Sequence, residues 1–316
     1  MINLTRLALA GAVAFGLAGA AGAQTVALGT TSGGSTGQVG TAIANVATQA
    51  GEIRVIPQET ANTAQYIPMV DQGRTEFGIA NYPQTYFAVT GTGMSAGMPA
   101  PNLMMVASLM DFTSGMLVLK ASGIASVADL KGHKVPRFPD NSLGDLVIRA
   151  VLATADLTYD DVTQVPTANF PAMFDGLKDG SLDTSIATAG AAHVMDIKAS
   201  AGDVTFLSLD GPEDEAKMDA VLPGTRLFDI TGMQAEGVEG PTKIFGYDYM
   251  LFTNKDTPDA VVTAMVKALY EGKAALDATG PLWESFAPER MGRSKGLPYH
   301  PAAIAFYQAQ GVPVAE

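Results

Sequence analysis

A glycine-rich stretch near the start of the chain most constrains what this sequence can fold into. It runs from Thr25 to Ala47 and reads TVALGTTSGGSTGQVGTAIANVA. The apolar run Val26–Leu28 predicts a strand, and regularly spaced apolar residues after Gly37 predict a helix. The loop between them consists of Gly, Ser and Thr, and glycines let a backbone approach a bound group closely. Because free N–H groups at a helix start attract anions, this unit predicts a cradle for a small anion.

Composition and charge exclude several classes of function. The chain has 316 residues, of which 47% are hydrophobic and 16% charged, as expected for one large globular domain or two lobes. A formal net charge of -13 argues against nucleic acid and anionic membrane surfaces as partners. The chain has no cysteine, which excludes disulfides and thiol catalysis. The three histidines lack a metal-binding spacing, so we expect neither a metal nor a cofactor.

Residues 1–23 have the pattern of a secretory signal peptide. Arg6 is their only charge, Leu7–Leu17 is a short apolar run, and Ala21-Gly22-Ala23 fits a cleavage site. The mature chain would then begin at Gln24 and be periplasmic. No later apolar run is long enough to cross a membrane. The alternative is an uncleaved anchor.

Strand and helix patterns alternate along the rest of the chain in two successive sets. The first set has predicted strands at Ile53–Pro57 and Phe77–Ala80 with a helix at Thr60–Val70 between them. Two short strands are predicted next, at Leu103–Leu109 and Met116–Leu119. The second set and the C-terminal part have predicted helices at Gly144–Thr154, Phe174–Lys178, Pro258–Ala278 (the longest) and Pro301–Gln310, and strands at Asp183–Ala187, Val204–Leu209 and Phe245–Thr253.

These patterns predict an α/β fold of two Rossmann-like lobes around a ligand cleft. Residues 24–114 plus 250–316 would form lobe I, and residues 115–249 would form lobe II. The chain would cross between the lobes twice, with hinges near Gly115 and Gly246. A cleft at the carboxyl ends of parallel strands is a common place for a small ligand.

Polar residues at the predicted strand ends are the candidate ligand contacts. In the cradle loop they are Thr30, Thr31, Ser32, Gly33, Gly34, Ser35 and Thr36. Elsewhere they are Asn62, Thr63, Asn81, Tyr82, Asn141, Ser142, Thr188, Gly190 and Tyr247. Uncharged donors and acceptors suit a polar ligand, and the alternative for the side chains at turns is helix capping or turn formation.

Arg137 is the cation expected to hold the anion. It ends a predicted strand at the start of lobe II, and a guanidinium pairs with a carboxylate through two parallel hydrogen bonds. The alternative is a surface arginine that pairs with Asp140.

The cradle loop also fits an enzyme motif. Gly33–Gly37 reads GGSTG, which matches the G-x-S-x-G turn of serine hydrolases with Ser35 as the nucleophile and a downstream histidine such as His300 as the base. The loop follows the first strand of the mature chain, whereas a hydrolase builds several strands before its nucleophile. We therefore expect a protein that is not an enzyme. A nucleotide-binding loop is excluded because Ser35 stands where its lysine is required.

The mature chain resembles the TAXI family of solute receptors, which serve TRAP transporters. The resemblance rests on the order and spacing of several segments: Gly29-Thr30 with Gly33–Gly37, Asp71–Gly73 with Glu76–Ile79, Ser122–Ile124 with Val127–Val135, Leu177–Gly180 with Asp183, and Leu297–Ala303 with Phe306-Tyr307. The chain departs from the family pattern at two expected cleft turns, Phe138–Gly144 and Ala61–Gln65.

The resemblance implies a type II periplasmic binding protein, which closes like a Venus flytrap around its solute. It further implies a monomer that captures a small organic anion, such as glutamate, 2-oxoglutarate or another carboxylate. The partner implied is the membrane permease subunit of a TRAP transporter. The altered turns leave the identity of the anion open.

Overall fold

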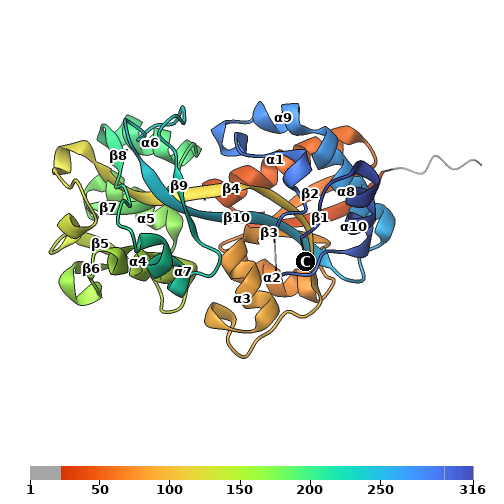
Figure 1. The fold of residues 1–316 in the computed structure, drawn as a ribbon, viewed down its shortest axis with the longest axis horizontal. Coiled ribbons are helices and arrows are strands. Elements are labelled where there is room, and N and C mark those ends of the chain that lie inside the picture. The colour runs from red at the N-terminus through yellow and green to blue at the C-terminus, as the bar shows by residue number, and fades with distance from the viewer. Residues whose placement is uncertain (1–22, 295, 316) are drawn as a thin grey trace, which may run out of the picture.

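The computed structural model describes residues 23–294 and 296–315, which form two α/β lobes (Figure 1). Two long neighbouring strands run from one lobe into the other. The α/β class predicted from the alternating patterns is therefore confirmed. The predicted signal peptide, apart from Ala23, lies outside the described residues.

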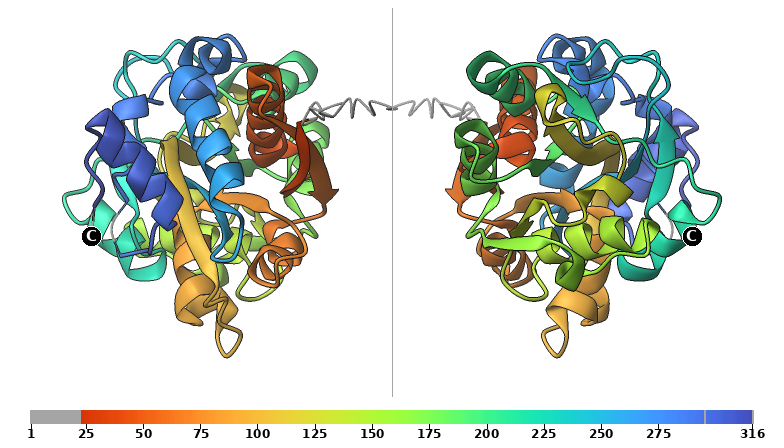
Figure 2. Two further views of the ribbon diagram at one scale, coloured as in Figure 1. Left: turned by 90° about the vertical axis from the view of Figure 1, so that its right-hand side faces the viewer. Right: turned by 90° about the vertical axis from the view of Figure 1, so that its left-hand side faces the viewer.

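Lobe I contains both the beginning and the end of the described chain. Its strands are β1 (Gln24–Thr31), β2 (Ile53–Thr60) and β3 (Phe77–Asn81), and its helices are α1 (Gly34–Ala50), α2 (Thr63–Asp71), α3 (Tyr82–Thr90), α8 (Asp259–Glu271), α9 (Lys273–Asp277) and α10 (Pro301–Gln310). β1 pairs in parallel with both β2 and β3. Helices α1 and α9 lie on one side of these strands and α2 and α3 on the other, as Figures 1 and 2 show from different directions.

Lobe II is built from the middle of the chain. Its strands are β5 (Lys134–Arg137), β6 (Thr163–Pro166), β7 (Thr184–Thr188), β8 (Val204–Phe206) and β9 (Arg226–Asp229), and its helices are α4 (Leu143–Thr154), α5 (Phe170–Asp179), α6 (Ala192–Ala201) and α7 (Asp214–Val221). β5 and β6 form a separate parallel pair. The other strands of the lobe pair with the two crossing strands.

The crossing strands are β4 (Leu103–Leu119) and β10 (Lys243–Asn254). They pair antiparallel with each other and lie side by side in the main sheet, whose order is β2-β1-β3-β10-β4-β7. Both are almost entirely buried, and the largest fully buried side chains, which include Trp283, Tyr66 and Phe252, lie in lobe I and on these strands. The lobe boundaries proposed above, at 114/115 and 249/250, fall inside these strands.

Two predicted elements differ from the structure. The two strands predicted at 103–109 and 116–119 are one strand, because residues 110–115 continue the pairing with β10 and β7 instead of turning. The single helix predicted at 258–278 is divided into α8 and α9 at Gly272, where a Cβ would overlap Val46 and the carbonyl of Ala268. Among the described helices the longest is α1, with 17 residues.

An ionic cluster fixes the two crossing strands to both lobes. Asp111 of β4 lies directly opposite Asp248 of β10. Without cations nearby, the two carboxylates would repel each other and destabilise this pairing. Arg293, from the C-terminal part of lobe I, reaches both carboxylates, at 2.6 and 2.8 Å. Arg226 of β9 reaches Asp248 at 2.8 Å. Burial raises the pKa of Asp248, but the two arginines and Ser294 outweigh it and leave the pKa lowered.

Candidate functional site

A cavity of about 380 Å³ lies between the lobes and is the candidate ligand site. Five of the described helices, α1 to α5, begin at its wall, with the N-cap residues Gly33, Asn62, Asn81, Ser142 and Asn169. Each of these helices follows the end of a strand, so the carboxyl edges of both sheets face the same space. Because helix N-termini carry partial positive charge, these helix starts contribute positive potential to the cavity although the chain is acidic overall.

The five helix starts differ in how their first N–H groups are used. Asn81, Ser142 and Asn169 cap their own helices, since their side-chain oxygens accept from backbone N–H groups at 3.0, 3.4 and 2.9 Å. Helices α1 and α2 have no such side-chain cap. Gly33 has no side chain to offer, and the side chain of Asn62 makes no capping bond. The uncapped N–H groups of α1 and α2 are therefore the ones available to an anion.

Hydroxyl groups surround the start of α1. Thr31 donates from Oγ1 to the carbonyl of Gly33 at 2.7 Å, which holds the loop in place. Thr36 shares a 2.5 Å hydrogen bond with the hydroxyl of Tyr249. Burial raises the pKa of Tyr249, so that phenol stays protonated. Ser35 is only 7% exposed, lines the cavity and has no hydrogen-bonded side-chain partner among the described residues.

The rest of the wall is largely aromatic. Phe112 of β4 stacks on Tyr249 and Tyr247 of β10, with ring centroids 4.4 and 6.2 Å apart. On the lobe II side, Phe138 follows β5, Phe170 and Phe174 belong to α5, and His193 belongs to α6. Their rings form a continuous row, with neighbouring centroids 5.2, 6.5 and 4.1 Å apart.

His193 is a neutral member of this row. Burial lowers its pKa to about 4, against a smaller opposing effect of Asp196. Its Nε2 accepts from the backbone N–H of Thr188 at 3.4 Å, which assigns the remaining proton to Nδ1. The imidazole is therefore an uncharged part of the wall near neutral pH.

The prediction that Arg137 holds the ligand is corrected by its position. Arg137 is not among the residues that line the cavity. Its guanidinium pairs with Asp140 and with the fully buried carboxylate of Asp145, and lies 4.3 Å from the ring centroid of Tyr159. The alternative reading, a pair with Asp140, is the one observed.

Arg137 instead organises one turn of the cavity wall. Asp145 accepts from the backbone N–H of Asn141 at 3.0 Å, and Arg149 adds a second cation at 3.0 Å. Asn141 has a left-handed backbone, with φ of 57°. The ion pair therefore fixes the 138–142 turn from behind, and Asp140, the one carboxylate of the lining, is neutralised by Arg137.

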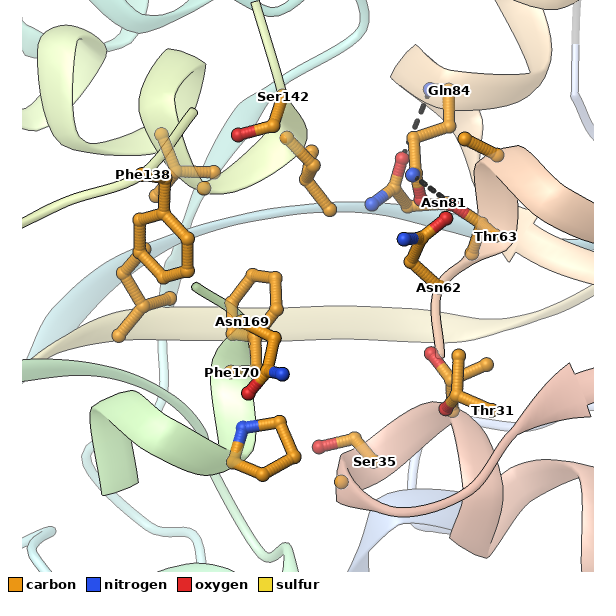
Figure 3. A pocket seen from close by; sticks show the side chains of 18 of the residues that line it. Thr31, Ser35, Asn62, Thr63, Asn81, Gln84, Phe138, Ser142, Asn169 and Phe170 are labelled. Carbon is orange, nitrogen blue, oxygen red and sulfur yellow. Dashed lines mark hydrogen bonds between the residues drawn. The ribbon is translucent and has the colours of Figure 1, made fainter. Parts of the chain in front are cut away.

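Most of the polar residues predicted from the sequence meet at the cavity. The lining includes Thr31, Ser32, Gly33, Gly34, Ser35, Thr36, Asn62, Thr63, Asn81, Asn141, Ser142, Thr188 and Tyr247. Figure 3 shows several of them, with those of lobe I facing Phe138 and Phe170 of lobe II.

Three further predicted residues, besides Arg137, lie outside the lining. Thr30 is 1% exposed and donates to the carbonyl of Thr36, so it braces the loop from inside. The ring of Tyr82 packs on Gly224 and stacks with Tyr86 at 5.9 Å. Gly190 has a left-handed φ of 78° and no room for a Cβ beside Pro281. All three residues pack behind the cavity lining and do not contact the cavity themselves.

Sequence reasoning missed the aromatic wall. Phe112, Phe170, Phe174 and His193 line the cavity, as does Asn169, and none of them was a predicted contact; Phe138 also lines it, within a turn that was expected at the cleft. One signal was present, because Asn169-Phe170-Pro171 has a capping residue followed by a proline in the first helical turn. That pattern places α5 at a strand end, where its first residues face the cleft.

The geometry does not support the hydrolase alternative. A catalytic serine needs a base within hydrogen-bond reach. His300 instead caps α10, where its Nδ1 accepts from the N–H of Ala302 at 3.2 Å. Within residues 23–294 and 296–315, no histidine is hydrogen-bonded to Ser35, and no group of three or more potential ligands could hold a metal ion. None of the helices in that part of the chain is both long and apolar enough to span a bilayer.

The chain belongs to the NMT1-like family, whose model matches residues 28–311. Solved structures with a similar fold include MatC from Rhodopseudomonas palustris with bound malate, at 13% identity and a TM-score of 0.55, over 84% of this chain and 92% of that one. A TctC solute binding protein from Polaromonas matches at 15% identity and a TM-score of 0.51, over 81% and 87% of the two chains.

A third structure, described as a periplasmic transporter, matches at 14% identity and a TM-score of 0.57, over 84% of this chain and 90% of that one. At these identities the likeness concerns the fold, which is that of periplasmic solute-binding proteins. The family match and the fold agree with the predicted type II binding-protein architecture.

Proposed function

We propose that this protein is an extracytoplasmic receptor that captures a small organic anion between its lobes and delivers it to a membrane permease. The observation that carries the proposal is the interlobe cavity, into which the uncapped starts of α1 and α2 open. No step of chemistry on the ligand is involved.

An anion is favoured by the electrostatics of the wall. Backbone N–H groups and helix dipoles stabilise negative charge at these helix starts. Ser35 and Asn62 add uncharged donors beside them. The carboxylate of Asp140, which would oppose an anion, is paired with Arg137 and is 70% exposed to solvent.

The partner that we propose is a permease of the TRAP type, on the strength of the segments that resemble TAXI receptors. A periplasmic location is supported by the signal-peptide pattern of residues 1–23 and by the fold. We further propose that the receptor is monomeric, with 24–114 plus 250–316 as lobe I and 115–249 as lobe II.

The test compares two variants of the helix start that differ only in charge. Gly33 has an extended backbone, with φ of 164°, and nothing within 4 Å of an added Cβ. Calorimetry with a panel of organic acids and their amides first identifies the acid bound most tightly. We expect Gly33→Asp to bind that acid at least about tenfold more weakly than Gly33→Asn, because a carboxylate at the start of α1 repels an anion.

Equal affinities in the two variants would contradict an anion at α1. Amides bound as tightly as their acids would contradict the anion class altogether. Melting temperatures in both variants that are no lower than that of the unmodified protein are the control for folding, since Asp and Asn are both good N-cap residues.

A further inference from the structure

The two sides of the cavity differ in chemistry, because the phenylalanines are concentrated on the lobe II side. On the lobe I side lie Thr31, Ser35, Asn62, Thr63 and Asn81, all polar. On the lobe II side lie Phe138, Phe170 and Phe174 together with Pro139, Pro171, Leu143, Val147 and Ile186, and the polar residues Asp140, Asn141, Ser142, Asn169 and Thr188 stand among them. Figure 3 shows the labelled polar side chains of lobe I across the space from Phe138 and Phe170. A solute that fills the cavity therefore meets hydrogen-bond donors at one end and apolar rings at the other.

The apolar side is shaped by rings rather than by flexible side chains. Phe138 is tilted by 41° against Phe170, and Phe174 stacks on His193 with an interplanar angle of 14°. On the crossing strands, Phe112 lies nearly parallel to both Tyr247 and Tyr249, at 10° and 21°. Aromatic faces and edges of this kind prefer another flat ring, in offset or edge-to-face contact.

The lobe II side offers a second acidic group no cation and fewer free helix starts than the lobe I side does. None of the lining residues is a lysine or an arginine. Ser142 and Asn169 each occupy one backbone N–H group at the start of their own helix, which leaves only the Ser142 hydroxyl and the Asn169 amide group as side-chain donors of these two residues. A second carboxylate placed against Phe138 and Phe170 would lose its hydration without gaining a cation, which is costly.

The polar and aromatic ends are close together. A Cβ built on Gly34, in the first turn of α1, would lie 3.9 Å from Cε2 of Phe174. One short molecule can therefore place an anionic group at the start of α1 and a ring against Phe174. The cavity, at about 380 Å³, exceeds the roughly 150 Å³ that suffices for benzene.

We propose that the solute is a small aromatic monocarboxylate. Its carboxylate binds the free N–H groups at the starts of α1 and α2 and the hydroxyl of Ser35, and its ring lies against Phe138, Phe170 and Phe174. This inference rests on the proposed receptor function and narrows the class of its ligand.

The experiment uses four probes of similar size with the purified protein, freed of bound solute by unfolding and refolding. They are benzoate, cyclohexanecarboxylate, benzyl alcohol and succinate. Calorimetry is expected to give the tightest binding for benzoate, with cyclohexanecarboxylate at least threefold weaker because it is not flat. Benzyl alcohol, which lacks the charge, and succinate, which lacks the ring, are each expected to be at least tenfold weaker.

A pair of variants then separates the ring contact from general damage. Phe170→Leu, at the half-buried edge of the wall, is expected to weaken benzoate binding at least fivefold and to leave succinate binding within twofold. Phe306→Leu, a half-buried phenylalanine of α10 outside the cavity lining, is the matched control and leaves both affinities unchanged.

The outcomes distinguish failure of the aromatic ligand class from failure of the proposed receptor function. Succinate or another dicarboxylate bound more tightly than benzoate overturns the aromatic class and leaves an anion receptor. Benzyl alcohol bound as tightly as benzoate overturns the anion, and with it both proposals. Equal losses in Phe170→Leu and Phe306→Leu overturn the ring contact.

Discussion

The ion pair behind the 138–142 turn provides the sharpest test of how the cavity wall is held. Removing Arg137 leaves the buried carboxylate of Asp145, 0% exposed, with Arg149 and the N–H of Asn141 as partners. We choose Arg137→Met, because a methionine of similar length keeps part of the packing on Tyr159. The complementary change is Asp145→Asn, which keeps an acceptor for Asn141 and removes the charge.

The magnitude follows from what remains around Asp145. Breaking a buried ion pair by removing one partner costs about 3–5 kcal/mol. Arg149 is 47% exposed and supplies one of the two cations, so about half of this cost, roughly 2 kcal/mol, is expected for Arg137→Met. The double variant is expected to be more stable than the sum of the single effects predicts, by about 1 kcal/mol or more, because no buried charge is left unpaired.

Urea unfolding followed by circular dichroism measures the four free energies of unfolding in this cycle. Single effects that add within about 0.5 kcal/mol would refute the reasoning that the two groups act as a pair. Calorimetry on the folded variants gives an independent readout. If Arg137 only positions the turn, anion affinity in Arg137→Met is expected to change by no more than about threefold. A fall of about a hundredfold would instead indicate that Arg137 contacts the ligand directly.

Two further predictions concern stability. Gly29→Ala is expected to lower the free energy of unfolding by about 1–3 kcal/mol, because its Cβ would lie 2.7–2.9 Å from atoms of the buried Tyr66 side chain. Gly232→Ala, with nothing within 4 Å of the added Cβ, is the control in urea unfolding. Equal losses in the two variants would contradict this account. The low pKa of His193 means that the unfolded chain binds a proton between pH 6.5 and about 4 that the folded chain does not. Stability therefore falls as the pH is lowered through this range, by up to about 3 kcal/mol, and His193→Gln is expected to flatten this slope in unfolding curves measured from pH 4 to 7; an unchanged slope would show that His193 is not the cause.

The fold could be predicted because local patterns and strand order agree in this chain. The strand–loop–helix unit at Thr25–Ala47 is found as β1 and α1, and α10 has the bounds that its proline and glycine predicted. The crossing strand β4 could not be predicted as one element. Its polar residues Thr113 and Ser114, followed by Gly115, read as a break, but they are buried in the middle of a sheet and continue its pairing.

The polar residues of the site could be predicted from the sequence, but most of its aromatic residues could not. Strand ends are visible in a sequence, so residues such as Asn62 and Asn81 could be placed at the cavity. Tyr247 and Tyr249 are two residues apart on β10, so strand alternation places both on one face, and both line the cavity. Because β10 is buried along nearly its whole length, the sequence does not show which of its faces meets the cavity.

The role of Arg137 could not be predicted because it depends on the burial of Asp145, which no sequence pattern shows. Asp145 looks like an ordinary acidic residue in the first turn of α4, where a carboxylate favours the helix dipole. The packing of lobe II buries Asp145 completely, and a buried carboxylate needs a cationic partner such as the guanidinium of Arg137.

The position of β10 in the sheet has a consequence for the order in which the chain can fold. β10 lies between β3 and β4, so the strands of lobe I stay incomplete until residues 243–254 have been synthesised. A nascent chain that ends after β4 exposes hydrogen-bonding edges on both β3 and β4, with the last helices of lobe I still missing. Neither lobe can therefore complete its sheet before residues 243–254 are in place, and the ligand cavity forms only then.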